Sequence, residues 1–193
     1  MEEQENVSTT AVTEQPKQLN WKKEAADWVL SIAVAIVLAL LIRRFVFTIV
    51  RVDGPSMNPT LSHGDTLFTT RLMYKPKVGD IVIFRPPASP KTPYVKRIIA
   101  LEGQTVDIDP LTGDVSVDGK VYDEPYIKEP IQRMGDMEFP YTVPKDTIFV
   151  LGDNRNNSHD SRDSDVGAVP VENIIGKAQI RLLPISTAGS LYK

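Results

Sequence analysis

The sequence predicts a mainly β protein, in which an antiparallel β-sheet or barrel-like domain follows one N-terminal transmembrane helix. An uncharged apolar run at residues 28–42 predicts the helix. Beyond residue 50, short segments of strand composition alternate with Gly and Pro, and this part of the chain has no long amphipathic helical pattern. Its 193 residues, 41% of them hydrophobic, give room for one domain and an anchor.

Composition excludes several classes of function. A net charge of -3 argues against a nucleic-acid-binding protein that relies on a basic surface, so we expect no nucleic-acid partner. The chain has no cysteine and only two histidines, which excludes thiol nucleophiles, disulfides and Cys/His zinc sites. Any enzymatic chemistry must therefore come from Ser, Lys, Asp, Glu, Arg or Tyr.

The N-terminal part predicts a tail and an anchor. Residues 1–24 are polar and we expect them to be disordered, whereas residues 25–47 are expected to form the transmembrane helix. As a helix, the charge-free run alone is only about 22 Å long, whereas the hydrocarbon core of a membrane is ~30 Å thick. The flanking residues must therefore be part of the helix if it is to span the membrane. The segment is not expected to be a cleaved signal peptide, because no small-x-small cleavage site follows it. It is not expected to be a buried core helix either, because it has no polar face. Positive charges on both sides leave the orientation undecided.

The β domain is expected over residues 48–185, followed by a C-terminal tail at 186–193. Strand composition predicts strands or hairpins at 66–71, 80–84, 94–101, 105–109, 115–121, 147–151 and 174–183. Asp118-Gly119 is a hairpin turn signal. The prolines of 86–93 indicate an exposed loop, and 124–144 a long connection. The apolar residues of 45–50 either dip into a membrane interface or form a strand.

Two segments hold side chains that a simple β core does not explain. Ser56 lies in Gly-Pro-Ser-Met-Asn-Pro, where constrained backbone could present a nucleophile; a serine in an ordinary turn is the alternative. Lys96 lies in the apolar segment 94–101, where alternation places it with Tyr94, Ile98 and Ala100, and places Arg97 on the face of Val95, Ile99 and Leu101. Such a lysine is either at an exposed sheet edge or desolvated toward its neutral form, which could accept a proton from serine.

A third segment, residues 152–163, interleaves carboxylates and arginines directly after an apolar strand. This pattern suggests a loop held by internal ion pairs. A solvated turn is one alternative, and a calcium loop is another, although Arg155 falls where a ligand oxygen belongs. A Ser/His/Asp triad is also possible, but neighbours such as His159 and Asp160 rarely point the same way, and His63 fits an ordinary turn. Lys96 on a strand is the better base.

Together these segments resemble the type I signal peptidases, the membrane-anchored Ser/Lys proteases, in their short Gram-positive form. The resemblance covers residues 28–181 and rests on four blocks in the family's order. They are Ser56-Met57 with Pro59-Thr60-Leu61, Gly79-Asp80-Ile-Val-Ile-Phe84, Tyr94-Val-Lys-Arg-Ile-Ile99, and Gly152-Asp-Asn-Arg with Asn157-Ser158 and Asp160-Ser161-Arg162. Each block alone is weak evidence, and the combination is strong.

The resemblance implies a role for each matching residue. Ser56 would be the nucleophile, Lys96 the general base, and Ser158 the group that orients the lysine amine. Asp160 and Arg162 would pair to hold their loop, and Asp153 to Arg155 would brace it. Contacts with substrate are expected at Val52, Met57 and Val95, along a substrate strand beside residues 49–56 and 93–96. No metal or organic cofactor is implied.

The resemblance also implies location and substrates. The N-terminus would be cytoplasmic, the catalytic domain extracytoplasmic, and the fold shared with self-cleaving repressor proteases. Secretory preproteins cleaved after Ala-x-Ala sites and the lipid bilayer would be the partners; the oligomeric state is not predicted. A self-cleaving regulatory protease, a relative specialised for few substrates, and a non-catalytic membrane-anchored binding module are the alternatives.

The sequence departs from the family pattern in two places. The lysine segment commonly continues Gly-Leu-Pro-Gly-Asp, but here residues 100–104 read Ala-Leu-Glu-Gly-Gln. Some relatives carry a serine two positions before the nucleophile that helps stabilise the oxyanion, and this position is Gly54. The oxyanion would then depend on the Ser56 backbone N–H and one further donor that the sequence does not identify.

Overall fold

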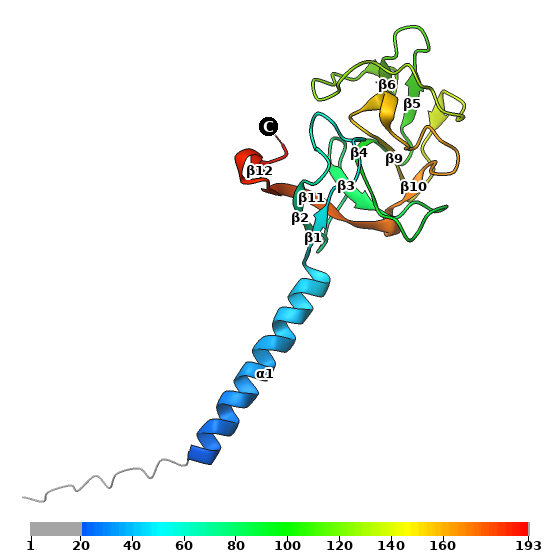
Figure 1. The fold of residues 1–193 in the computed structure, drawn as a ribbon. Coiled ribbons are helices and arrows are strands. Elements are labelled where there is room, and N and C mark those ends of the chain that lie inside the picture. The colour runs from blue at the N-terminus through cyan, green and yellow to red at the C-terminus, as the bar shows by residue number, and fades with distance from the viewer. Residues whose placement is uncertain (1–20, 193) are drawn as a thin grey trace, which may run out of the picture. The chain divides into compact units, whose positions relative to one another are not determined.

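The computed structural model describes residues 21–192, which divide into two units (Figure 1). The first unit ends at Leu40, and the second begins at Leu41 and contains all strands. Helix α1 spans Trp21–Phe45, so it begins four residues before the expected anchor and ends two residues earlier. We describe each unit by itself.

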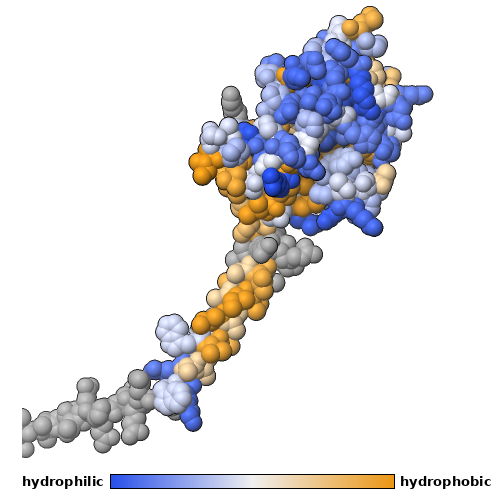
Figure 2. Space-filling model, in the orientation of Figure 1, coloured by the Kyte–Doolittle hydropathy of each residue, from blue (hydrophilic) through white to orange (hydrophobic). Residues whose placement is uncertain are grey.

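Helix α1 exposes large apolar side chains along the part from Trp28 to Leu40, where Trp28 is 71% exposed. Figure 2 shows these apolar residues as a continuous stretch on the visible face of the helix. The sequence between these two residues carries no charge and no polar stripe, as expected from the apolar run. Among residues 21–192, no helix reaches the combined length and apolar character that a membrane crossing needs.

The second unit is built on an eight-stranded antiparallel sheet with the order β1-β2-β11-β3-β4-β9-β10, in which β12 also pairs with β11. A smaller antiparallel sheet has the order β7-β6-β5-β8, and Figure 1 shows β5 and β6 beyond the ends of β4 and β9. The strands of the large sheet are β1 (Phe47–Arg51), β2 (Thr66–Thr70), β3 (Ile81–Phe84), β4 (Tyr94–Leu101), β9 (Thr147–Leu151), β10 (Val169–Pro170), β11 (Ile174–Leu183) and β12 (Gly189–Ser190). Those of the small sheet are β5 (Thr105–Ile108), β6 (Val115–Val117), β7 (Lys120–Val121) and β8 (Tyr141–Thr142). Three short 3₁₀ helices complete the unit: η1 (Arg155–Asn157), η2 (Val171–Asn173) and η3 (Ile185–Thr187).

All seven expected strand and hairpin segments are strands in the structure, so the mainly β, antiparallel fold class is confirmed. The hairpin turn is also confirmed: Asp118 and Gly119 have φ of 52° and 77°, the positive values of a type I′ turn. The apolar residues after the helix form β1, which pairs with β2 at the end of the large sheet. Residues 189–192, expected in a tail, return to β11.

The expected alternation along β4 is wrong after Ile98. A bulge at Ile99 interrupts the pairing with β9, because Ile98 pairs with Val150 while Ala100 pairs with Phe149. The extra residue exchanges the two faces beyond it. Ala100 therefore joins the cluster of Ile99, and Leu101 packs with the cluster of Ile98 instead.

Apolar clusters cover both faces of the central strands. On one face, Ile81 and Ile83 of β3 pack with Met57; on the other, Val82 and Phe84 pack with Ile98. A third cluster fills the space between the small sheet and the strands β4 and β9. Polar side chains on β4 project from the faces that these clusters cover, so Lys96 and Arg97 are only 4% and 6% exposed.

Candidate active site

Ser56 lies in the loop between β1 and β2, which is held by burial and by hydrogen bonds. Met57 is 1% exposed and Leu61 is fully buried, so the next residue and the end of the loop are anchored in the core. The Asn154 N–H donates to the Ser56 carbonyl at 3.0 Å, and the Asn154 side-chain amide donates to the Pro55 carbonyl at 3.1 Å. The backbone that presents the Ser56 hydroxyl is therefore fixed on both sides.

Lys96 lies on β4 inside the sheet and is 4% exposed, so the alternative of a lysine at an exposed sheet edge is excluded. Its Nζ lies 2.9 Å from Ser56 Oγ and 3.1 Å from the Val95 carbonyl. The ring of Tyr94 lies beside the amine, with its centroid 5.1 Å from Nζ. The two side chains that sequence reasoning selected forty positions apart are thus in hydrogen-bond contact.

Burial lowers the pKa of the Lys96 amine from 10.5 to about 8. The carboxylates of Asp160 and Asp153 partly oppose this lowering, and the guanidinium of Arg162 adds to it. An amine with a pKa near 8 has a substantial neutral fraction in mildly alkaline water. A neutral amine within hydrogen-bond distance of a hydroxyl has the geometry and basicity of a general base.

The expected ion pair between Asp160 and Arg162 is confirmed. Arg162 donates through Nε and Nη2 to the two carboxylate oxygens at 2.8 and 3.0 Å, and neither residue is exposed to solvent. The Gly152 N–H donates to the same carboxylate at 3.0 Å. Although burial alone raises it, the pKa of Asp160 is held below its usual range by the Arg162 guanidinium and this N–H.

Asp153 and Arg155 brace the loop through partners that the sequence did not indicate. Arg97 of β4 donates to the Asp153 carboxylate through Nε and Nη2 at 2.9 and 2.6 Å, and the Thr60 hydroxyl also donates to it. Arg155 donates to both oxygens of Glu124 at 2.6 Å. We call residues 152–163 the polar loop. Asp153 thereby links β4, the Ser56 loop and the polar loop at one buried point.

Ser158 lies beside the pair but does not make the bond that the family resemblance implied. Its hydroxyl is buried, and it makes no hydrogen bond of standard geometry to Lys96 or to another group within residues 21–192. It lies close enough to the Asp160 carboxylate to help lower the pKa of that group. A methyl group on Gly152 would lie 2.2 Å from Ser158 Oγ and 2.5 Å from the Ser56 carbonyl. Only glycine at position 152 lets the two serine segments approach this closely.

The histidines do not assemble a triad around Ser56 in the described structure. The His159 ring nitrogens lie 3.0 Å from Asp163 and 2.9 Å from Asp165, rather than beside Asp160. His63 contacts Asp53 at 3.2 Å. The titratable side chain in hydrogen-bond contact with Ser56 Oγ is Lys96, and its role as the base stays a prediction.

Ser56 and Lys96 line a cleft of about 340 Å³. Val52 and Val95, two of the three expected substrate contacts, also line this cleft. Met57 does not, because its side chain is buried in the cluster below the loop. The structure gives Met57 a role in packing the loop, and its expected contact with substrate stays a prediction.

Two residues that sequence reasoning missed hold the polar loop from outside. Arg133 pairs with the Asp163 carboxylate and donates to the Ser158 carbonyl at 3.2 Å. Glu124, the partner of Arg155, is 6% exposed at its side chain. Both lie in the long connection of residues 124–144, where no pattern of spacing marks them in the sequence.

A serine hydroxyl in hydrogen-bond contact with a buried lysine amine, on an antiparallel β scaffold, is an arrangement typical of a class of serine hydrolases. Comparison with known proteins then gives the family. The family model described as "Signal peptidase, peptidase S26" matches residues 25–183. The chain belongs to this family and is a serine peptidase.

Individual relatives agree with this assignment. The "Probable signal peptidase I-1" of Synechocystis is 43% identical over 169 residues, which cover 82% of each chain. The "Signal peptidase I" of Bacillus licheniformis is 38% identical over 88% of this chain and 95% of its own length. A crystal structure of a signal peptidase I from Enterococcus faecalis shares 27% identity over 55% of this chain and 98% of that chain, with a TM-score of 0.43.

Proposed function

We propose that this protein is a membrane-anchored endopeptidase that removes signal peptides from exported preproteins, cutting after Ala-x-Ala-type sites. Its membership of the signal peptidase family supports the reaction class. The observation that carries the assignment of residues is the 2.9 Å contact between Ser56 Oγ and the buried amine of Lys96.

In the proposed reaction Ser56 Oγ attacks the scissile carbonyl while the neutral Lys96 amine takes the hydroxyl proton. The resulting lysinium then gives this proton to the leaving amine, and an acyl-enzyme ester remains on Ser56. Lys96 next removes a proton from water, which attacks the ester carbonyl. The lysinium then returns this proton to Ser56 Oγ as the ester C–O bond breaks, which releases the signal peptide with a free carboxylate and restores the neutral amine. No step needs a metal or an organic cofactor.

The supporting groups act on the geometry of this pair. Asp153 and Arg97 hold the Ser56 loop against β4, and Asp160 with Arg162 fixes the polar loop. We assign to Ser158 the orienting role that the resemblance implies, since its hydroxyl is buried beside the site and makes no hydrogen bond of standard geometry in the described part of the chain. The Ser56 N–H is the first oxyanion donor, and Gly54 supplies no side chain for the second.

We propose that the substrate binds as an added strand between residues 49–56 and residues 93–96. β1 is the end strand of the large sheet, so one of its edges is free to pair with an extended peptide. The cleft has a volume of about 340 Å³ and is lined by Val52 and Val95 among others, which is consistent with small apolar residues in the substrate positions that face it.

We further propose that residues 25–45 of α1 anchor the chain, with residues 1–24 cytoplasmic and the β domain, which begins at Phe47, extracytoplasmic. The exposed apolar side chains of α1 support an apolar environment around the helix. This topology places the cleavage regions of exported preproteins and the cleft on the same side of the bilayer.

The test of the reaction uses full-length protein in detergent or lipid with a purified preprotein, and sequences the new N-terminus of the product. Ser56→Ala and Lys96→Ala should each abolish cleavage while the protein stays folded. Matched controls are Ser62→Ala, an exposed serine of the same loop, and Lys91→Ala, an exposed lysine before β4; both should cleave at the wild-type rate. Normal processing by Ser56→Ala or Lys96→Ala would refute the assignment.

A further inference from the structure

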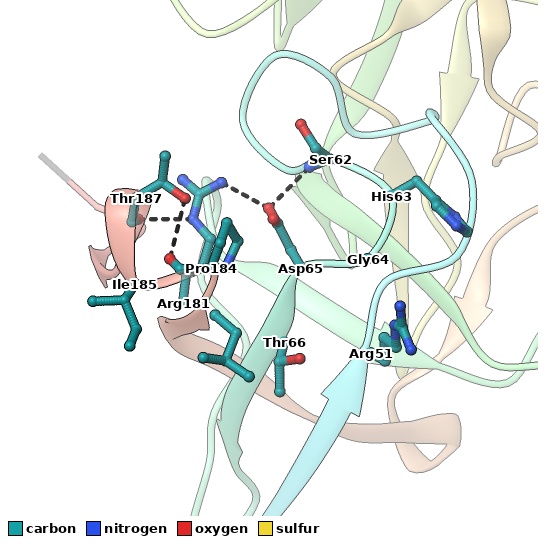
Figure 3. A pocket seen from close by; sticks show the side chains of 11 residues that line it. Arg51, Ser62, His63, Gly64, Asp65, Thr66, Arg181, Pro184, Ile185 and Thr187 are labelled. Carbon is teal, nitrogen blue, oxygen red and sulfur yellow. Dashed lines mark hydrogen bonds and ion pairs between the residues drawn. The ribbon is translucent and has the colours of Figure 1, made fainter.

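The segment after β11 returns to the sheet and is fastened at successive points. After the turn of η3, Gly189 and Ser190 form β12 and pair with Arg181 and Ile180 of β11. Figure 3 shows how Arg181 ties two segments together: its Nε donates to the Thr187 carbonyl at 3.0 Å and its Nη1 to Asp65 Oδ2 at 2.7 Å. Asp65 closes the loop that carries Ser56, so the segment is tied to the end of that loop. We call residues 185–192 the C-terminal strap.

Tyr192 fills a break in the large sheet. The ladder between β3 and β11 reaches the pair Val82 and Lys177, and the next pair in this antiparallel register is Ile81 and Ala178. These two residues do not bond directly. Instead the Tyr192 hydroxyl accepts from the Ile81 N–H at 3.0 Å and donates to the Ala178 carbonyl at 2.7 Å. The Tyr192 hydroxyl thus takes the place of the direct backbone hydrogen bonds between Ile81 and Ala178.

The strap also completes the apolar cluster below the nucleophile. Leu191 and Tyr192 pack against the cluster that contains Met57 and Ile81, both 1% exposed or less. The Lys177 amine lies 4.4 Å from the centroid of the Tyr192 ring. Burial raises the pKa of the Tyr192 phenol, so the hydroxyl stays protonated and able to donate.

We propose that the C-terminal strap positions the Ser56–Lys96 pair, and that Tyr192 is the positioning residue through which it acts. The proposal rests on the proposed function of that pair. On the side of β3 away from Tyr192, Ile81 pairs with Arg97, and the next residue, Val82, pairs with Lys96. The bridge therefore lies one strand away from the lysine and from the arginine that holds Asp153.

Loss of the Tyr192 hydroxyl bridge should raise the pKa of the Lys96 amine. Without the hydroxyl, the buried Ile81 N–H and the Ala178 carbonyl lose their partner and attract water. Water between β3 and β11 loosens the cluster that supports Met57 and hydrates the β3–β4 pair. A better hydrated Lys96 binds its proton more tightly, so less of it is neutral at a given pH.

The test compares Tyr192→Phe with wild-type full-length protein in the same detergent or lipid. We expect kcat to fall about threefold to tenfold with little change in KM, and the acid limb of the kcat/KM profile to move to higher pH. We also expect faster amide hydrogen exchange at Ile81. Ser190→Ala removes a hydroxyl that bonds the Tyr192 backbone at 2.8 and 3.2 Å, and should change the same quantities in the same direction by less.

Two controls separate positioning from simple destabilisation. Tyr141→Phe removes a phenol hydroxyl that has no hydrogen-bond partner among the described residues, and should change nothing. Val115→Ala lowers stability within the small-sheet cluster and should leave the acid limb in place. The proposal is overturned if Tyr192→Phe keeps the wild-type kcat and pH profile, or if Val115→Ala shifts the profile equally.

The exchange rate at Ile81 distinguishes this proposal from the function on which it rests. It needs no catalysis, so it can be measured in the Ser56→Ala background. Unchanged exchange at Ile81 in Tyr192→Phe would reject the bridge itself. Cleavage by Ser56→Ala would instead reject the proposed nucleophile and leave the measured role of the bridge in the sheet intact.

Discussion

The proposed chemistry depends on one amine whose surroundings disfavour its charged form. Lys96 is enclosed by the sheet and by the ring of Tyr94, and the charged groups that act on it are Asp160, Asp153 and Arg162. Two carboxylates favour the protonated form, but burial outweighs them and brings the pKa to about 8. The same lysine at an exposed sheet edge would have a pKa near 10.4, so its neutral fraction in neutral or mildly alkaline water would be more than about a hundredfold smaller.

The first prediction concerns the pH dependence of cleavage. Because the neutral amine is the proposed base, kcat/KM should rise about tenfold per pH unit below pH 8 and level off above it. Lys96→Arg should be inactive throughout, because a guanidinium does not deprotonate in this range. A pH series with a peptide substrate checks both. Activity of Lys96→Arg would point to another base, and His159, which lines the same cleft, would be tested first.

The second prediction concerns stability. A pKa lowered on folding means that the folded state resists protonation, so Lys96 destabilises the fold below pH 8, and this cost disappears as pH rises toward 10.5. Replacing it with an apolar side chain of similar length, Lys96→Met, should raise the free energy of unfolding at pH 7 by up to about 3 kcal/mol. Denaturant titrations at pH 7 and pH 10 test this, and the gain should shrink at the higher pH. A variant less stable than wild type at pH 7 would contradict it.

The third prediction concerns Gly152. Gly152→Ala places a methyl group 2.2 Å from Ser158 Oγ and 2.5 Å from the Ser56 carbonyl, so the Ser56 loop must move. We expect kcat to fall more than about tenfold, because small displacements of a nucleophile cost rate steeply. A folding check by circular dichroism separates displacement from unfolding. A folded variant with normal kcat would show that the close approach of the two loops is dispensable.

At the scale of elements, β4 and the polar loop work as one unit through buried ion pairs. Arg97 and Asp153 are almost fully removed from solvent, and their side chains connect β4 to the loop that follows β9. A buried pair is strongly destabilised when only one partner is removed, because the remaining charge is left uncompensated. The position of the polar loop beside β4 therefore depends on an intact Arg97–Asp153 pair.

The fourth prediction follows from that pair. Asp153→Asn should destabilise the protein by about 3–5 kcal/mol and should also reduce kcat, since Thr60 and the Ser56 loop lose the same partner. Asp165→Asn is the control, because Asp165 and His159 are both partly exposed, and its effect should stay below about 1 kcal/mol. Thermal or denaturant unfolding measures both. Equal effects of the two variants would show that the burial of the Asp153 pair is unimportant.

Much of this element structure could be predicted from the sequence. Composition and turn chemistry located the long strands and the Asp118-Gly119 hairpin, because strand propensity and positive φ are local properties. The bulge at Ile99 could not be predicted, since it depends on the register with β9. The partners of Asp153 and Arg155 were missed for a similar reason: Arg97 and Glu124 are distant in sequence and meet the loop only in the folded chain.

At the scale of the whole molecule, the pairing of Ser56 with Lys96 could be predicted from the sequence, whereas the residues that support this pair could be predicted only in part. Ser56 and Lys96 could be selected from the sequence because a serine held in a proline-rich turn and a lysine within an apolar strand are both unusual in a simple β core. The C-terminal strap gave no such signal, because its bonds to β11 use backbone groups and one tyrosine hydroxyl. A segment that is held mainly through its backbone has no side-chain pattern to mark it, so the sequence predicts a tail.

The fifth prediction tests the proposed anchor and its orientation. In intact cells, protease added from outside should digest residues 48–185 or their exposed loops and leave an N-terminal epitope tag protected, and the chain should stay with membranes after alkaline carbonate washing. Changing Leu38 and Leu40 to Lys should release it, because charges in an apolar span cost several kcal/mol. Release of the unmodified chain by carbonate would contradict the anchor.

The titration of the Lys96 amine tests most directly whether this buried lysine can act as the base for Ser56. Nuclear magnetic resonance of protein labelled at lysine Cε can follow it, with Lys96→Met identifying the signal. We expect a midpoint near pH 8, moved upward in Tyr192→Phe. A midpoint near 10.5, the value of a lysine in water, would contradict the proposed mechanism.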